Sequence, residues 1–308
     1  MASSATVPLL DGLARDLGPR QDRRRVSWGG LSLMSPAVIC IGVLFVAPIF
    51  YSFYLAFTNL QLVGPAAQAF HFTGLTNIRR LAGDPTFIQS LWLTAIFVGG
   101  SAIFGCTVVG MILALLMQKA LAPIRLGMAG IVLFAWVLPE VTVAFVWYAF
   151  SQSGGTLGIL TGSKQDFLST MPMLIICLAN LWRQVAFSML LFAAGLRNVP
   201  EEVLAAAEVE GASAVRRFFS ITLPIMRPTI ITNFLLVTLM NLSTFTLIYV
   251  MTQGGPNNAT AITGVYMYIV GFTFDSLGYA AAISLALIAV GAAFSLLYAR
   301  TLKDEVAV

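Results

Sequence analysis

Six long apolar runs, separated by short polar segments, constrain this chain more than any other feature of its sequence. An α-helix needs roughly 20 apolar residues to cross the hydrocarbon core of a bilayer, and each run is long enough. Their predicted bounds are roughly 30–57, 88–117, 126–150, 171–196, 229–251 and 277–299. Because the runs are continuous and do not alternate in and out, the sequence predicts an all-α, polytopic membrane protein with six transmembrane helices.

The composition supports a bilayer as the solvent. Of the 308 residues, 58% are hydrophobic and 10% are charged, whereas soluble domains average about 25% charged residues. The net charge of +4 is small and gives no sign of nucleic-acid binding. Cys40, Cys106 and Cys177 lie inside apolar runs without a CxxC pattern, and His71 is the single histidine. We therefore expect packing cysteines and no metal site.

The basic residues predict the orientation. Of the 17 Lys and Arg, 13 lie on the side that holds both termini and the loop 197–228. Basic residues favour the cytoplasmic side, so we expect both termini in the cytoplasm of a multi-pass protein of the plasma (inner) membrane. The first run is too long for a signal-peptide core and is interpreted as a retained helix. The predicted organisation is a tail 1–29, a membrane domain 30–300 and a tail 301–308.

The loop between the fourth and fifth runs, 198–228, carries the clearest local signals. Asn198 is a candidate cap for a first helix, and Gly211 is expected to end that helix, because glycine accepts a positive φ. Ser213 is expected to cap a second helix. Pro224 and Pro228 then turn the chain into the fifth run. The pattern predicts a helix-turn-helix knob at the membrane surface, with an apolar tip and charged flanks.

The segment Ala205–Gly211, AAAEVEG, followed by Leu223–Pro224, resembles the EAA loop of ABC importer permeases, whose consensus is roughly EAAxxDG and then LP. Ala205 replaces the leading Glu, and Glu210 replaces the usual Asp. The resemblance implies the type I ABC importer (MetI-like) permease fold and a coupling loop that docks on an ATPase. The implied ATPase-coupling residues are Ala205, Ala206, Glu208, Glu210, Gly211, Ala212, Phe218, Leu223 and Pro224. The alternative for the loop alone is an amphipathic segment lying on the bilayer.

Three outer segments resemble the carbohydrate branch of these permeases, the maltose and glycerol-phosphate types. They are residues 72–87, FTGLTNIRRLAGDPTF, residues 252–256, TQGGP, and residues 278–284, GYAAAIS. Ile78 stands where the branch usually has Tyr. With the loop, the resemblance extends over about residues 30–300. It implies the permease subunit of a sugar importer, of the compact six-helix kind.

Two charged residues fall inside predicted spans. A charge at the centre of a membrane helix costs from about 3 to more than 10 kcal/mol, so it faces a partner or a cavity. Glu140 and Arg183 are predicted at similar depths, roughly 15 and 18 Å from the outer end of their spans. They are expected either to pair or to line the pathway together. The family commonly has a proline where Glu140 stands.

Polar residues near Arg183 resemble the sugar-contacting segment of the maltose-type permease, and residues of the fifth run match further sugar-contacting positions. The implied substrate-binding residues are Glu140, Asn180, Arg183, Gln184, Phe187, Asn241 and Thr244. Polar residues in membranes also form hydrogen bonds between helices, and this alternative stays open.

The resemblance implies several partners: a second, homologous permease, two ATP-binding-cassette ATPase subunits and an extracytoplasmic substrate-binding protein. The sequence has no GxxxxGK[ST] motif, so ATP is expected on the partners, and the chain itself is expected to be no enzyme and to hold no cofactor. One alternative is a permease of the same fold for a non-sugar or anionic substrate, such as a glycerophosphate ester. A stand-alone secondary transporter would predict inverted repeats and broken helices, and the sequence shows neither. A membrane enzyme is a further alternative, but the sequence offers it a single His outside the predicted spans and no paired carboxylates.

Overall fold

The computed structural model describes residues 28–306, and side chains from 33 to 301. Nearly all of the predicted tail 1–29, and most side chains of the predicted tail 301–308, lie outside the described residues. Within them the chain is helical and has no strand; the one β-bridge joins Thr58 and Phe72. The all-α prediction is confirmed.

The chain divides into two compact units, Met1–Tyr51 and Ser52–Val308. The described part of the first unit contains α2 (Trp28–Ile41), the π-helical η1 (Gly42–Val46) and the beginning of α3 (Ala47–Ala56). Residues Leu33–Ala56 are long and apolar enough to cross a membrane. The first predicted span, 30–57, is therefore confirmed.

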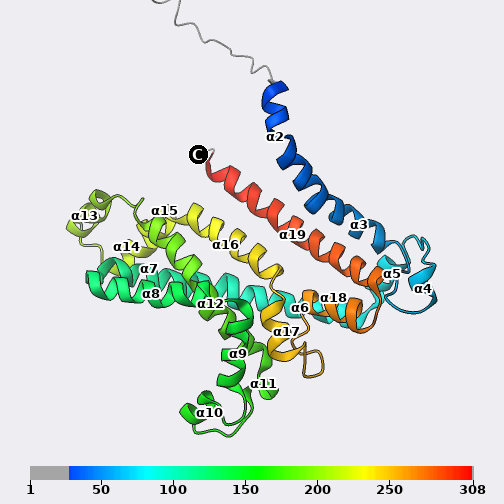
Figure 1. The fold of residues 1–308 in the computed structure, drawn as a ribbon. Coiled ribbons are helices and arrows are strands. Elements are labelled where there is room, and N and C mark those ends of the chain that lie inside the picture. The colour runs from blue at the N-terminus through cyan, green and yellow to red at the C-terminus, as the bar shows by residue number, and fades with distance from the viewer. Residues whose placement is uncertain (1–27, 307–308) are drawn as a thin grey trace, which may run out of the picture. The chain divides into compact units, whose positions relative to one another are not determined.

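The larger unit is built around α12 (Pro172–Leu196) (Figure 1). This helix packs against α7 (Thr107–Lys119), α8 (Ala122–Val137) and the π-helical segment η2 (Val98–Cys106). Its first half also contains α4 (Pro65–Gln68), α5 (Thr76–Gly83), α6 (Pro85–Phe97), η2 (Val98–Cys106), α7 (Thr107–Lys119), α8 (Ala122–Val137), α9 (Glu140–Ser151), α10 (Thr156–Thr161) and α11 (Phe167–Thr170). Its second half contains α13 (Glu201–Val209), α14 (Ala214–Arg217), η3 (Phe218–Thr222), α15 (Leu223–Ile225), α16 (Arg227–Leu242), α17 (Thr246–Thr252), α18 (Thr263–Tyr268), η4 (Ile269–Thr273) and α19 (Leu277–Val306).

Among the described residues, four helical stretches are long and apolar enough to be membrane spans, or up to six if each of two bent pairs counts as one span. The unbroken stretches in the larger unit are Pro85–Lys119, Pro172–Leu196 and Leu277–Thr301. They match the second, fourth and sixth predicted runs. The third and fifth runs were predicted as continuous helices, and for both of them this is wrong.

The third run breaks at Pro139. The helix pair Ala122–Val137 and Glu140–Thr161 is bent by 104°. Proline lacks an N–H group and pushes the preceding residue out of the helical region, and Leu138 is extended accordingly, with ψ 136°. The break places Glu140 in the first turn of α9 instead of the middle of a continuous span.

The fifth run breaks between α16 and α17, at residues 243–245. The hydroxyls of Ser243 and Thr244 both donate to the carbonyl of Met240, at 2.9 and 3.2 Å. Such side-chain bonds compete with the helical ladder. Broken helices are therefore present, and the expectation that the chain lacks them is corrected. The absence of broken helices can therefore no longer be used as an argument against a secondary transporter.

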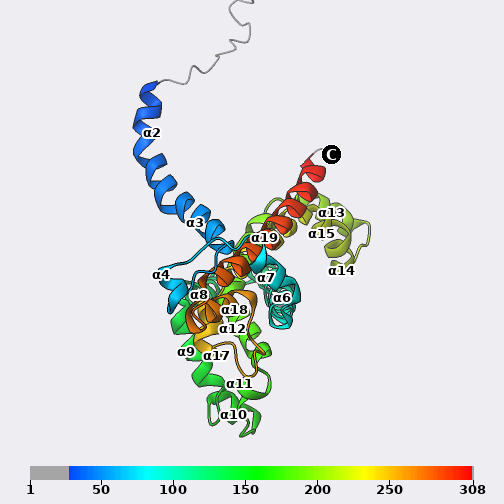
Figure 2. The same ribbon diagram turned by 90° about the vertical axis from the view of Figure 1, so that its right-hand side faces the viewer.

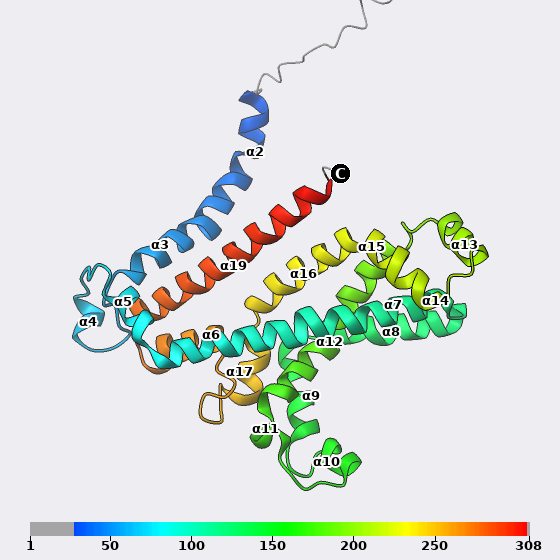
Figure 3. The same cartoon turned by 180° about the vertical axis from the view of Figure 1, so that it is seen from behind.

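The short helices of the larger unit gather in two separate places. Helices α13–α15 gather beside the end of α7, whereas α9–α11 project at a different place, far from them (Figures 2 and 3). A cluster that includes Met111, Met189, Phe192 and Met226 fills the end near α13–α15. A second cluster, which includes Tyr266 and Tyr279, fills the region of α5, α6, α18 and α19.

Candidate functional site: a surface knob and a polar centre

The loop 198–228 forms the predicted knob, and its turn is built on Gly211. Helix α13 ends in a Schellman motif: the N–H of Ala212 donates to Ala207 O at 2.9 Å, and the N–H of Gly211 donates to Glu208 O at 3.0 Å. Gly211 has φ +82°, which residues with a side chain rarely adopt. A Cβ added there would meet no atom of this chain within 4 Å. Glycine is therefore required by the backbone and not by crowding within the subunit.

The second helix of the knob begins as predicted. Ser213 Oγ accepts the N–H of Arg216 at 3.3 Å and so caps α14. Arg217 donates to Leu204 O and forms an ion pair with Glu208, which joins the two helices. The expected cap at Asn198 is wrong. Pro200 occupies the N-cap position of α13, and no side chain caps it.

The knob presents an apolar surface that its own chain leaves uncovered. No residue of α13 or α14 is buried. Val209 is 90% exposed, Val215 68% and Phe219 61%. Of the implied coupling residues, Ala205, Ala206, Glu208, Glu210, Gly211 and Pro224 are exposed, and Ala212, Phe218 and Leu223 are half-buried. A 67° bend between Ala214–Ile225 and Arg227–Leu242 separates this surface from the fifth span.

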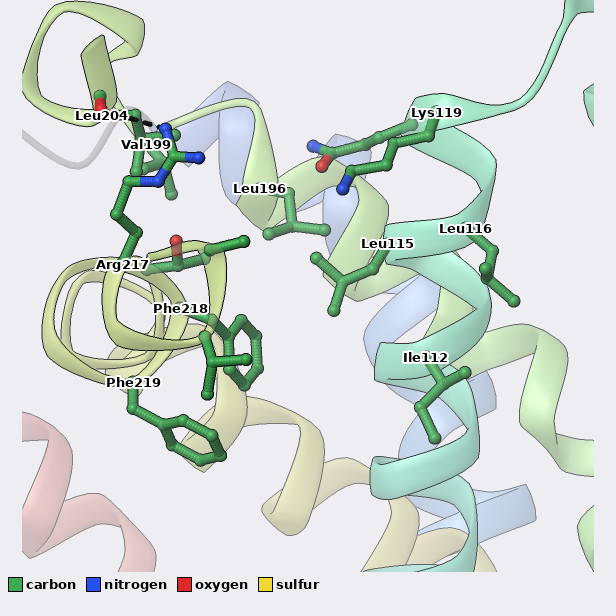
Figure 4. Close-up of a pocket in the computed structure, with 14 residues that line it drawn as sticks. Ile112, Leu115, Leu116, Lys119, Leu196, Val199, Leu204, Arg217, Phe218 and Phe219 are labelled. Carbon is green, nitrogen blue, oxygen red and sulfur yellow. Dashed lines mark hydrogen bonds between the residues drawn. The ribbon is translucent and has the colours of Figure 1, made fainter. Parts of the chain in front are cut away.

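A groove lies between the knob and the end of α7, and we name it the loop groove (Figure 4). Its volume is about 570 Å³. Its lining consists of Ile112, Leu115, Leu116, Gln118, Lys119, Leu196, Val199, Leu204, Ala214, Val215, Arg217, Phe218, Phe219 and Thr222.

Three amide side chains form one buried cluster at the centre of the larger unit. Asn180 Nδ2 donates to Ser101 Oγ at 2.9 Å and to Asn241 Oδ1 at 2.8 Å. Gln184 Nε2 donates to Asn241 Oδ1 at 3.3 Å, and Asn241 Nδ2 donates to Gln184 Oε1 at 3.3 Å and to Val237 O at 2.7 Å. Asn180 and Asn241 are fully buried, and Gln184 nearly so. We name these three amides and Ser101 the amide cluster.

The amide cluster holds η2, α12 and α16 together, and its bonds stay within the subunit. This geometry favours the hydrogen bonds between helices over direct substrate contact. Thr244 is buried as well, and its hydroxyl donates a hydrogen bond to Met240 O.

Glu140 and Arg183 form the pair that their predicted depths suggested. Arg183 Nη2 lies 3.1 Å from Glu140 Oε1, and their side chains are 17% and 26% exposed. The break at Pro139 brings Glu140 to this place on α9, and Arg183 stands on α12. Arg183 Nε is buried and has no hydrogen-bond acceptor among the described residues. Phe187 is half-buried one turn further along α12, with its ring 6.2 Å from that of Trp136.

The outer segment 72–87 has a structural role that the sequence pattern did not reveal. Asn77 Nδ2 donates to Ala56 O and Thr58 O, at 2.9 and 2.8 Å, at the end of α3. Asp84 caps α6 and accepts hydrogen bonds from the hydroxyls of Tyr266 and Tyr279, both at 2.6 Å. We name Asp84 and these two tyrosines the outer clasp.

The outer clasp shifts the titration of its carboxyl group. Burial raises the pKa of Asp84, but the hydrogen bonds from Tyr266 and Tyr279 and from the N–H groups of Phe87 and Thr86 together outweigh burial, so the pKa lies below its ordinary value. Burial and the bond to Asp84 raise the pKa of Tyr266. The described residues of segment 72–87 therefore serve the fold, and none of them lines the amide cluster.

Comparison with known proteins identifies the kind of chain. Residues 106–303 match the family described as binding-protein-dependent transport system inner membrane component. The chain is 30% identical to the sulfoquinovosyl glycerol transport system permease protein of Agrobacterium fabrum, over 89% of this chain and 90% of the relative. It is 31% identical to the sn-glycerol-3-phosphate transport system permease protein of Pectobacterium atrosepticum, over 85% of this chain and 90% of the relative.

A solved structure shares the fold. It is a bacterial alginate ABC transporter in complex with an alginate pentasaccharide-bound periplasmic protein. The TM-score is 0.72, the sequence identity is 19%, and the match covers 94% of this chain and 95% of the other.

Proposed function

The chain belongs to the family of binding-protein-dependent transport system inner membrane components, and from this premise we propose that it is the permease subunit of an ATP-driven importer for a sugar or sugar derivative. The named relatives support the substrate class, since sulfoquinovosyl glycerol is a sugar derivative and sn-glycerol-3-phosphate is a phosphorylated polyol. Both termini and the loop 198–228 face the cytoplasm in this proposal, as the basic residues predict.

The observation that carries the proposal is the uncovered apolar tip of the knob. Val209, Val215 and Phe219 are largely exposed, and apolar surface of this kind marks an interaction site. The sequence has no phosphate-binding loop of its own. Two partner ATPases are therefore proposed to hold the knob and to move it as a rigid body when they close on ATP. A second, homologous permease and an extracytoplasmic binding protein complete the assembly.

Substrate contact is proposed at the Glu140–Arg183 pair and Phe187. Arg183 Nε is a buried donor that lacks an acceptor among the described residues, and a hydroxyl or ring oxygen would supply one. Phe187 and Trp136 offer aromatic faces nearby. Asn180, Gln184 and Asn241 then hold the helices behind this site. Glu140 also neutralises Arg183, so the pair as a whole favours an uncharged polyhydroxyl group.

A second candidate substrate is an anionic sugar derivative or glycerophosphate ester, which Arg183 favours. An acidic group would have to displace Glu140 from Arg183 before it could bind. Replacement of Glu140 by Gln separates the two candidates. It should raise uptake of the anionic substrate relative to the neutral one if Arg183 reads charge.

Reconstitution tests the proposal as a whole. The chain is purified with its co-expressed permease, ATPases and binding protein and placed in proteoliposomes. We expect sugar uptake that requires both ATP and the binding protein. Uptake by the purified chain alone, driven by an ion gradient, would contradict the proposal and support a secondary transporter.

A further inference from the structure

The loop groove is apolar along its length and cationic at one end. Its walls are Ile112, Leu115 and Leu116 of α7 on one side and Phe218 and Phe219 on the other. In Figure 4, Lys119 and Arg217 lie toward one end of the groove, and Ile112 and Phe219 lie toward the opposite end. The occupant that fits this lining is therefore amphipathic, with a long apolar part and one anionic group.

The depth of the groove restricts where that occupant comes from. Lys119 is the last residue of the span Pro85–Lys119. Ile112 precedes it by seven residues, which is about 10 Å along a helix. The wall on α7 therefore belongs to a helix that is long and apolar enough to cross a membrane, so acyl chains of the bilayer can reach it from the side. An occupant that lies along α7 as far as Ile112 is therefore expected to come from the bilayer.

The charges at the end of the groove complement a phosphate group. Lys119 forms no ion pair or hydrogen bond with any residue of the part of the chain that the structure describes. Arg217 is paired with Glu208, but a guanidinium has five N–H donors and retains capacity. The proposed orientation places this end at the cytoplasmic leaflet, whose anionic lipids attract basic residues near the membrane surface. Basic pockets between membrane helices on that side bind lipid headgroups.

We infer that the loop groove binds an anionic phospholipid of the cytoplasmic leaflet. The phosphate lies between Lys119 and Arg217, and an acyl chain lies along Leu115, Ile112 and the phenylalanines of η3. The volume of about 570 Å³ lies within the range of roughly 300–1,000 Å³ of small-molecule sites. Because the lipid packs between α7 and the knob, it would restrain the loop that is proposed to transmit ATPase movement. This inference depends on the proposed orientation of the loop and not on the substrate.

The test compares two lipids on the full-length chain in detergent micelles. Dioleoyl-phosphatidylglycerol and dioleoyl-phosphatidylcholine have the same acyl chains, and only the first has a net negative charge. We expect native mass spectrometry to retain phosphatidylglycerol preferentially, and this lipid to raise the melting temperature more than phosphatidylcholine. Lys119→Gln should weaken the apparent affinity for phosphatidylglycerol about fivefold. Lys164→Gln is the control, because Lys164 is exposed and is predicted on the opposite side of the membrane. It should leave the affinity for phosphatidylglycerol unchanged.

A second pair of variants tests the apolar part. Leu116→Trp fills the groove and should lower phosphatidylglycerol retention with Lys119 intact, whereas Leu126→Trp, on an exposed face of α8 outside the groove, should not. Equal retention of both lipids, or equal behaviour of the Lys119 and Lys164 variants, would overturn the inference. So would loss of the lipid on co-purification with the second permease together with a crosslink from Leu116→Cys to that subunit, since the groove would then be a protein interface.

Discussion

The amide cluster and the knob differ in how far contacts within the chain satisfy and bury their side chains. In the amide cluster, Asn180, Gln184 and Asn241 are buried and hydrogen-bonded to one another. In the knob, no residue of α13 or α14 is buried, and Val209 is 90% exposed. The polar groups of the first region are satisfied within the chain, whereas the second region has an exposed apolar surface that we propose a partner covers.

Because of this difference, we expect changes in the amide cluster to lower the stability of the chain and changes on the knob to lower its proposed coupling to an ATPase. A change inside the amide cluster leaves a buried polar group without a partner, which costs free energy of folding. A change on the knob disturbs few contacts within the chain and should act on the assembled transporter. The Glu140–Arg183 pair is intermediate, because it is satisfied in part and exposed in part. The predictions below are ordered by their expected effect on the free energy of unfolding.

The largest effect is expected from Asn241→Leu. It removes the two hydrogen bonds between Asn241 and Gln184 and one partner of Asn180. The free energy of unfolding should therefore fall by about 2–4 kcal/mol. Thermal unfolding in detergent measures this loss. Asn198→Leu is the matched control, since Asn198 is exposed in the loop. Equal stability of the two variants would mean that the cluster does not hold η2, α12 and α16 together.

Arg183→Ala should have the next largest effect, about 1–2 kcal/mol, because it leaves Glu140 without its counter-charge at a partly exposed site. Adding Glu140→Gln should restore part of the stability. Sugar uptake in proteoliposomes should stay low in the double variant, because Arg183 is also proposed to contact substrate. Recovery of uptake along with stability would assign the pair a purely structural role.

The charge-assisted hydrogen bonds of the outer clasp should make a pH-dependent contribution to the free energy of unfolding. Asp84 is only half-buried and solvent screens its charge, so this contribution should be about 1 kcal/mol. The pKa of Asp84 is lower in the folded protein than its ordinary value of 3.8. Its stabilisation is therefore present above about pH 4 and is lost as the pH falls through the folded pKa. Asp84→Asn should lower the melting temperature at pH 7 and flatten its decline in acid. An unchanged acid profile would show that Asp84 does not titrate with unfolding.

The smallest effect on unfolding is expected from Glu210→Ala and Ala205→Glu in the knob, within about 0.5 kcal/mol of the parent chain. Both residues are exposed. Glu210→Ala should nevertheless lower ATP-dependent uptake moderately, whereas Ala205→Glu restores the residue common in the family and should be tolerated. Uptake and thermal unfolding are measured on the same preparations. Parallel losses in both would remove the distinction between the two regions.

The sequence predicted the knob well because its signals are local. Gly211 and Ser213 act through the backbone of their own neighbours, so a positive φ and a cap could be inferred from residue type alone. The pairing of Glu140 with Arg183 was also within reach, since equal depth in the membrane limits the possible partners. The cap at Asn198 failed because Pro200 supplies a fixed φ at the helix start without a side-chain bond.

Other features depend on contacts that hydrophobicity does not encode. The hydrophobicity of the runs predicted the length of the third and fifth spans but not their breaks. Pro139, Ser243 and Thr244 interrupt the hydrogen bonds of the helices, while both runs remain apolar overall. Asn180 could be predicted to be polar and inside the membrane. Its role required knowledge that Ser101 and Asn241 face it from two other helices. The tyrosine hydroxyls that donate to Asp84 lie 182 and 195 residues away in the sequence, beyond any local pattern.

The most direct test of the coupling role proposed for the loop 198–228 is Gly211→Asp in the reconstituted transporter. The variant should insert normally, because the substitution lies outside the spans. Its left-handed backbone would be strained by about 1 kcal/mol or more, and a charge would be added beside the apolar tip. The measurement is binding-protein-stimulated ATP hydrolysis together with uptake of labelled substrate. We predict that uptake is lost and hydrolysis no longer responds to the binding protein, with melting temperature nearly unchanged. Wild-type values for both activities would contradict the assignment of this loop as the coupling element.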